Sequence, residues 1–194
     1  MARPTQTAVF SRTLPGGVRV ITDLTQTGSG NIYWVDSVNG SSANSGNGPD
    51  DALITWDAAV NKCTANQGDT IILMENHAES ISAAAGVDLD VAGVTTIGLG
   101  NGGQTPAITF DTAATADIDI DAADVTIQNV HFIAGYADVA AAIDVNADDF
   151  TLKNCRFTEG TNLNFLVCVQ DASSTNSDRI TVDAVSYTHL TLPT

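Results

Sequence analysis

Basic residues are scarce in this sequence. The 194 residues include 7 Lys and Arg but 23 Asp and Glu, which gives a formal net charge of -16 at pH 7. A chain with this balance neutralises phosphate groups poorly, so we expect neither nucleic acid nor an anionic membrane surface as a partner. The acidic excess favours solubility instead.

Long hydrophobic runs are missing as well. Hydrophobic residues make up 43% of the chain, which is enough for a packed core, but no run approaches the roughly 20 apolar residues of a membrane span. The N-terminal sequence MARPTQTAVFSRTLPGG has no continuous apolar stretch. We therefore predict no membrane span and no secretory signal peptide.

Cysteine is rare, and its spacing carries no metal-binding or disulfide signature. The chain has 3 cysteines, Cys63, Cys155 and Cys168, with no CxxC pair. An odd number at these spacings favours buried free thiols, which fit a protein made in a reducing cytoplasm. P-loop, HExxH and nucleophile-elbow motifs are also missing, so no cofactor is expected apart from the calcium ion considered below.

The most informative feature present is a block that occurs twice, 25 residues apart. Residues 116–135 read ADIDIDAADVTIQNVHFIAG, and residues 141–160 read AAIDVNADDFTLKNCRFTEG. A fixed period in this range is typical of solenoids, in which each repeat stacks on the next. The identical pairs are Ala116/Ala141, Ile118/Ile143, Asp119/Asp144, Ala122/Ala147, Asp124/Asp149, Thr126/Thr151, Asn129/Asn154, Phe132/Phe157 and Gly135/Gly160.

Alternation within the repeats predicts which side chains face inward. In a strand, successive side chains point to opposite faces, so Ile118 and Ile120 in one repeat, like Ile143 and Val145 in the next, are expected inside. The same alignment stacks the ring of Phe132 on that of Phe157. It also places Asn129 over Asn154 at a bend, where a buried asparagine ladder would satisfy backbone groups that the bend leaves unpaired. Asp124 and Asp149 are interpreted as turn residues.

Short strands joined by tight turns fill most of the chain, with two or three strands in each coil. One amphipathic helix is predicted over residues 55–66, with Thr55 as N-cap and with Trp56, Ala59, Val60 and Cys63 on one face. We expect this helix to cap the first coil, because an open solenoid end exposes strand edges. Strands are predicted at 32–38, 69–74, 87–91, 94–100, 117–121, 125–132, 142–146, 150–157, 166–170 and 179–184.

Three regions are distinguished along the chain. Residues 1–30 are interpreted as an N-terminal arm with one strand-like segment at 18–22, and residues 31–184 as the capped solenoid domain. The last ten residues, VSYTHLTLPT (185–194), do not continue the repeat pattern and resemble a translated sequencing-adapter read-through. We therefore expect the natural chain to continue past Ala184, with further coils missing from this sequence.

The segments YWVDSVNGSSANSG, GDTIILMENHAESI and VAGVTTIGLGNGG, followed by the IxIxAxxVTIxNxxF repeats, resemble pectin-lyase-like proteins. The resemblance covers residues 31–184 and implies an all-β fold, a right-handed single-stranded parallel β-helix. VDSVNG, GDTI and GLGNG are particularly similar to β-helix proteins of tailed-phage and marine metagenomic sequences. This implies a non-enzymatic virion protein, such as a tail fibre, spike or capsid decoration, assembled in the host cytoplasm. Its expected partners are other virion subunits or cell-surface polysaccharide, and a homotrimer is one expected state.

Two other functions stay open. One is a polysaccharide lyase or glycoside hydrolase whose catalytic coils are lost by truncation, since the same fold hosts both. Members of these enzyme groups carry a calcium-binding Asp cluster with a basic residue, or paired Asp with Gly-His-Gly and Arg-x-Lys. This chain lacks the last two motifs, and Lys153 and Arg156 are the only Lys or Arg within the two similar repeats. The other is a secreted adhesin. His77 and His131 are interpreted as isolated turn or surface residues.

A column of acidic residues is the best candidate site. Asp90, Asp119 and Asp144 are predicted to occupy equivalent outward positions on successive coils, about 4.8 Å apart. Carboxylate oxygens at this spacing suit Ca²⁺, a hard cation, or the hydroxyl groups of a glycan. The alternative is a solvated acidic face without a ligand, because like charges at this distance cost only about 1 kcal/mol in water. We favour the solvated face.

Overall fold

The computed structural model describes residues 30–171 and 178–188. The predicted arm, including the segment at 18–22, and the end of the predicted tail lie outside these residues. Within them are fifteen strands and one α-helix, α1 (Trp56–Val60). The strands are β1 (Ile32–Val35), β2 (Thr70–Leu73), β3 (Ala78–Ile81), β4 (Val87–Asp88), β5 (Thr95–Gly98), β6 (Ala107–Phe110), β7 (Ile118–Ile120), β8 (Thr126–Gln128), β9 (His131–Ala134), β10 (Ile143–Val145), β11 (Thr151–Lys153), β12 (Arg156–Thr158), β13 (Val169–Asp171), β14 (Thr181–Asp183) and β15 (Ser186–Thr188).

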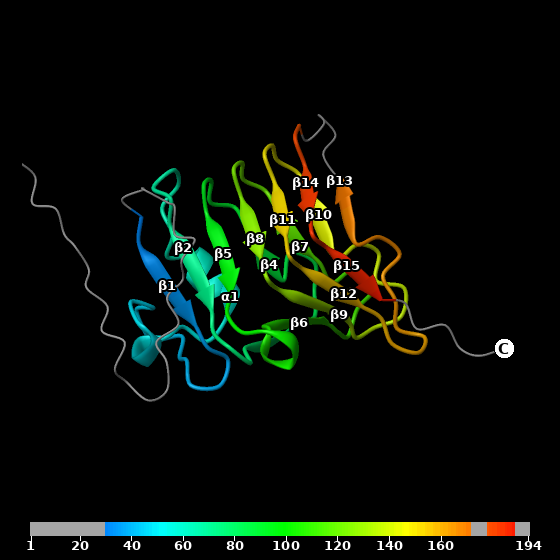
Figure 1. The fold of residues 1–194 in the computed structure, drawn as a ribbon, viewed down its shortest axis with the longest axis horizontal. Coiled ribbons are helices and arrows are strands. Elements are labelled where there is room, and N and C mark those ends of the chain that lie inside the picture. The colour runs from blue at the N-terminus through cyan, green and yellow to red at the C-terminus, as the bar shows by residue number, and fades with distance from the viewer. Residues whose placement is uncertain (1–29, 172–177, 189–194) are drawn as a thin grey trace, which may run out of the picture.

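The strands form three parallel sheets that stack as a β-solenoid of about four turns (Figure 1). Sheet A has the order β1-β2-β5-β8-β11-β14, sheet B β3-β6-β9-β12-β15 and sheet C β4-β7-β10-β13. Each complete turn contributes one strand to each sheet, and every strand pairs with its equivalent one turn away. The predicted all-β solenoid with stacked repeats is therefore confirmed. Strands β3 and β6, which complete sheet B, were not predicted.

The predicted inward positions form the core. Ile118, Ile120, Ile143 and Val145 are all fully buried between the three sheets, and they stack in register across β7 and β10. Burial of such columns removes apolar surface from water turn after turn, so each coil is stabilised chiefly by its neighbours.

The predicted aromatic stack is confirmed, and two further rings pack against it. The rings of Phe132 and Phe157 are both buried and lie 5.0 Å apart with an interplanar angle of 29°. Phe110 packs beside the column, with its centroid 6.3 Å from that of Phe132, while Ile108 is the residue in register with Phe132. Phe165 packs edge-on against both Phe110 and Phe157.

The asparagine ladder lies at the bend between sheets A and B. Asn129 and Asn154 adopt φ values of 56° and 51°, in the left-handed region that Asn tolerates best among residues with a side chain. Asn129 Nδ2 donates to the carbonyl of Gly98 at 2.7 Å, and Asn154 Nδ2 donates to Asn129 Oδ1 at 3.2 Å. The ladder is therefore confirmed, but Asn154 is exposed rather than buried, because the next turn carries Ala184 at this bend and extends the ladder no further.

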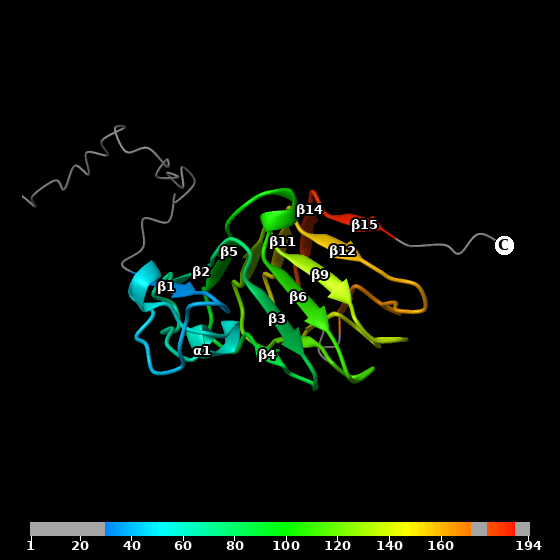
Figure 2. The same cartoon turned by 90° about the horizontal axis from the view of Figure 1, so that it is seen from below.

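The first turn is closed by a cap that is shorter than predicted. Helix α1 begins after Thr55, whose Oγ1 accepts a hydrogen bond from the amide of Ala58 at 3.2 Å. It ends at Val60 because the amides of Lys62 and Cys63 bond to carbonyls three residues back, which tightens the chain into a turn. The helix buries its apolar face against β1, β2 and β4 (Figure 2). The loop around Gly46 and Leu53 hydrogen-bonds the outer edge of β1.

At the C-terminal end, the solenoid extends further than predicted. The repeat pattern was predicted to end at Ala184, but Ser186–Thr188 form β15, which pairs in register with β12. Tyr187 falls directly on the column of Phe157. The inward positions of this last turn, such as Val182 and Tyr187, are 53% and 52% exposed, since no further strand among residues 30–171 and 178–188 packs on them.

Candidate functional site

Sheet C carries a row of polar side chains on its outer face. Strand pairing places Asp88 of β4, Asp119 of β7, Asp144 of β10 and Gln170 of β13 side by side. The predicted pairing of Asp119 with Asp144 is therefore confirmed. The predicted place of Asp90 in this row is wrong, because Asp88 takes it.

The error at Asp90 has a simple cause. Asp88 and Asp90 are two residues apart, so alternation alone assigns both to the outer face. Their level in the stack depends on the length of the coil that separates them from Asp119. That coil is longer than the 25-residue repeat because it includes the 3-10 helix Gly102–Gln104 and the loop that follows β6. Asp88 and Asp119 are consequently 31 residues apart.

Three carboxylates of this face come close enough to share a cation. Oxygen atoms of Asp117, Asp119 and Asp144 all lie within 4.8 Å of one another. Asp117 immediately precedes β7, and its Oδ1 accepts a hydrogen bond from the amide of Ala85. One oxygen of Asp144 and one of Asp88 are buried without a hydrogen-bond partner among the described residues. The sequence analysis missed Asp117, although it lies in the predicted strand 117–121, because the next repeat carries Ala142 at the equivalent position and so gave no acidic pair there.

The electrostatics of this face favour protonation. Burial raises the pKa of Asp119 to about 6, and the neighbouring carboxylates of Asp117, Asp121 and Asp144 add to the shift. Burial likewise raises the pKa values of Asp88, Asp117 and Asp144. The charged carboxylates therefore destabilise one another, and a bound cation or a proton would relieve the repulsion. Three carboxylates provide only part of the six to eight oxygen ligands of Ca²⁺, so waters or a glycan would supply the rest.

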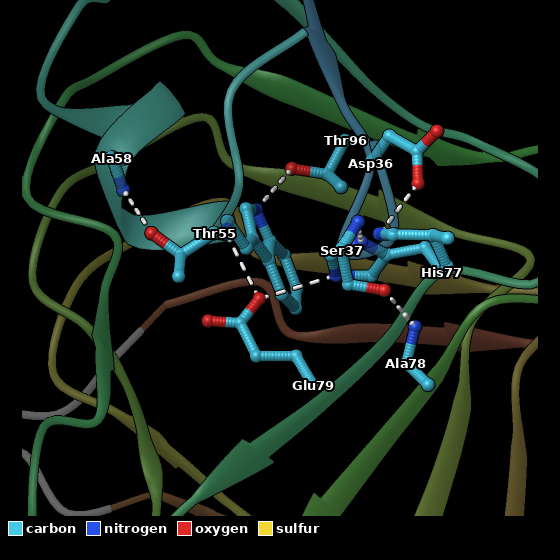
Figure 3. Close-up of polar contacts among 10 residues, drawn as sticks. Asp36, Ser37, Thr55, Ala58, His77, Ala78, Glu79 and Thr96 are labelled. Atoms are coloured by element: carbon cyan, nitrogen blue, oxygen red, sulfur yellow. Dashed lines mark hydrogen bonds and ion pairs between the residues drawn. The ribbon is translucent and has the colours of Figure 1, made fainter. Parts of the chain in front are cut away.

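His77 is buried, contrary to its interpretation as a turn or surface residue. Its Nδ1 accepts the amide hydrogen of Ser37 at 3.1 Å, and its Nε2 lies 3.1 Å from Glu79 Oε2. Glu79, which faces His77 in Figure 3, also accepts the amide hydrogen of Trp56, the first residue of α1, through Oε2 at 2.9 Å. Trp56 Nε1 in turn donates to Thr96 Oγ1 at 3.1 Å. This network ties the cap helix to the first two turns, which is a structural role.

His131 also has close partners, where the sequence analysis expected an isolated residue. An Nη2–H of Arg156 donates to its Nδ1 at 2.8 Å, so Nδ1 carries no proton. Its Nε2 then donates to Thr158 Oγ1 at 2.8 Å. Burial and the Arg156 charge lower the pKa of His131 to about 4, so the ring is neutral at pH 7.

The remaining candidates from the sequence have structural environments. Asp124 and Asp149 adopt φ values of 59° and 62°, which confirms that they are turn residues. All three cysteines are free, and burial raises the pKa of Cys63 to about 12 and those of Cys155 and Cys168 to about 11. Thiols with such values carry almost no reactive thiolate at pH 7.

Comparison with known proteins gives a likeness in fold. No family model matches the chain, and no curated protein matches it. A solved structure of a GH136 lacto-N-biosidase from Eubacterium ramulus superposes with a TM-score of 0.56 at 14% sequence identity. The match covers 81% of this chain and 34% of the enzyme chain, so this chain spans about a third of that protein's length. At this identity the likeness defines the class, a parallel β-solenoid. None of the helices in residues 30–171 and 178–188 is long and apolar enough to cross a membrane.

Proposed function

We propose that this chain is a structural element of a phage virion, from a tail fibre, spike or capsid decoration, and that its outer surface binds host glycans. The observation that carries the proposal is the row of Asp88, Asp119, Asp144 and Gln170 along sheet C. Carboxylate and amide oxygens accept hydrogen bonds from sugar hydroxyls, and the strands hold them at a regular spacing of about 4.8 Å. The virion assignment rests on the resemblance of VDSVNG, GDTI and GLGNG to tailed-phage β-helix proteins.

The solenoid suits a presenting role for a physical reason. Its core columns are continuous from turn to turn, so the outer side chains are fixed to a stiff support rather than to loops. A preorganised surface loses little conformational entropy when a ligand binds. A row of weak hydrogen bonds can then act together along an extended polysaccharide.

The glycan part is tested by titrating purified protein with capsular and O-chain polysaccharides from candidate hosts. We expect Asp119→Asn combined with Asp144→Asn to weaken binding at least about fivefold, because charge-assisted hydrogen bonds are the strong ones. Asp183→Asn is the matched control, since Asp183 is an exposed carboxylate on the outer face of sheet A. Equal affinities of the double variant and the control would contradict a glycan role for sheet C.

The virion part needs a separate measurement. Peptides of this chain should be detected by mass spectrometry in phage particles purified from the source sample, and the protein mass in solution should show whether it trimerises. Recovery of its peptides only from the cellular fraction would contradict the virion assignment while leaving glycan binding intact.

A glycoside hydrolase or polysaccharide lyase is the second candidate. It is favoured by Asp119, whose pKa of about 6 and nearby carboxylates are typical of a carboxylic acid that can donate a proton. The solenoid likeness to a lacto-N-biosidase adds a substrate class to test. Release of sugar from lacto-N-biose-containing glycans or from polyuronates, lost in Asp119→Asn, would favour this candidate over the structural one.

A further inference from the structure

The outer faces of sheets B and C differ in charge. The outward positions of sheet C hold Asp88, Asp119 and Asp144. The outward positions of the sheet B strands hold no carboxylate, in a chain with 23 acidic residues. Besides the apolar Ile133, they carry small, hydroxyl and basic side chains: Ala78, Ser80, Ala107, Thr109, His131, Arg156, Thr158, Ser186 and Thr188.

Arg156 lies on this face, on the strand next to the last strand of sheet B. Its strand β12 lies between β9 and β15, so His131 and Ser186 are its neighbours across the sheet. Within the described chain Arg156 forms no ion pair, and it donates instead to a neutral histidine. Its Nε is buried with no hydrogen-bond partner. Glu159, the nearest carboxylate in the sequence, is itself buried and accepts the amide hydrogen of Phe165.

Arg156, His131 and Thr158 are linked by two successive hydrogen bonds that run in the same direction. Arg156 donates to His131, and His131 donates to the hydroxyl oxygen of Thr158. The hydroxyl hydrogen of Thr158 is therefore left to donate to something outside this trio. The trio thus offers guanidinium and hydroxyl donors, together with one remaining lone pair of Thr158 Oγ1.

We propose that the outer face of sheet B binds a carboxylate of an acidic glycan through Arg156 and Thr158, with His131 as the positioning residue between them. The planar guanidinium matches a carboxylate better than a point charge does. The small and hydroxyl side chains beside it leave room for a sugar ring and offer partners for its hydroxyl groups. This site lies on a different face from the row of sheet C, so each proposal can fail without the other.

The probe is a galacturonate oligosaccharide, and its methyl ester, which lacks only the charge, is the matched ligand. We expect wild-type protein to bind the acid at least about tenfold more tightly than the ester, the difference of one charged hydrogen bond. Arg156→Gln should remove that preference, and Arg156→Lys should keep part of it. Lys153→Gln is the matched control, because it also removes one positive charge, three residues away in the sequence but on sheet A. Its affinity for the acid should stay within twofold of the wild-type value.

A titration of His131 by NMR separates a binding role from a merely structural one. A carboxylate bound beside the trio should raise the pKa of His131 from about 4, and the methyl ester should not. Thr158→Val should weaken binding severalfold without changing the melting temperature by more than about 2 °C, since it removes a hydroxyl from an outward position. Equal binding of acid and ester, no detectable binding of the acid at millimolar concentration, or unchanged binding in Arg156→Gln would overturn the proposal.

Discussion

Replacement of Phe132 by Ala is the most direct test of the core. The ring is fully buried, stacks on Phe157 at 5.0 Å and contacts Phe110 at 6.3 Å. Loss of the buried ring costs about 2–3 kcal/mol of transfer free energy. The lost aromatic contacts add about 0.5–1.5 kcal/mol, and the cavity left in a close-packed column adds more. We therefore expect the free energy of unfolding to fall by about 3–5 kcal/mol.

The assay is urea unfolding followed by circular dichroism, with linear extrapolation to water. Tyr136→Ala is the matched control, because Tyr136 is an aromatic residue that is 41% exposed, and we expect it to cost less than about 1 kcal/mol. The variants must unfold in a single transition with similar slopes for the comparison to hold. A Phe132→Ala value close to that of Tyr136→Ala would refute the inward register on which the whole stack depends.

Three further predictions follow from the polar groups. Asp119→Asn should leave the protein folded and flatten the pH dependence of its stability. The pKa of Asp119 is raised from 3.8 to about 6, so its stabilising contribution is complete only below pH 3.8 and is lost as the pH rises through about 6. Calorimetry at several pH values measures this, and a large calcium-dependent loss of melting temperature would show a metal site instead. The pKa of His131 is lowered to about 4, so its contribution has the opposite sign and is lost as the pH falls from 6.5 toward 4; His131→Gln should remove that slope, and an unchanged slope would contradict the neutral ring. Glu79→Gln should cost about 1–3 kcal/mol by weakening the link between His77 and the amide of Trp56. Asp90→Asn, at an exposed acidic residue, is the control and should cost less in the same urea assay, and equal costs would contradict the role of Glu79.

The sequence predicted the middle of the solenoid best, where two similar repeats lie side by side. Identity of Ile118 with Ile143 and of Phe132 with Phe157 fixed both the period and the inward face. Strand pairing then follows from stacking equivalent residues, as β7 on β10 and β9 on β12 show. No comparable repeat covers β3 and β6. In β3, only Ile81 is a large apolar residue, so alternation gave too weak a signal there.

The polar sites were harder to predict, because they depend on residues that different coils bring together. The contact between His77 and Glu79 is local, but the amides of Ser37 and Trp56 come from the first turn and from the cap. His131 and Arg156 occupy equivalent positions in the two repeats, so the alignment did contain their contact. The contact was missed because the alignment was read only for identical residues. A search of equivalent positions for residue pairs that can hydrogen-bond would have found His131 and Arg156.

The last turn shows that a segment whose sequence differs from the repeats can still pair with the sheet. The sequence of Val185–Thr188 does not match the earlier repeats, yet Tyr187 places an aromatic ring on the column of Phe157, between hydroxyl residues that face outward. A strand needs only this alternation and an unpaired neighbouring edge, and β12 offers that edge. Resemblance to a foreign sequence therefore does not determine whether a segment pairs with the sheet. No further strand in the described part of the chain packs on the exposed Val182 and Tyr187, whereas at the first turn α1 packs on β1 and β2 and the loop around Leu53 bonds to β1.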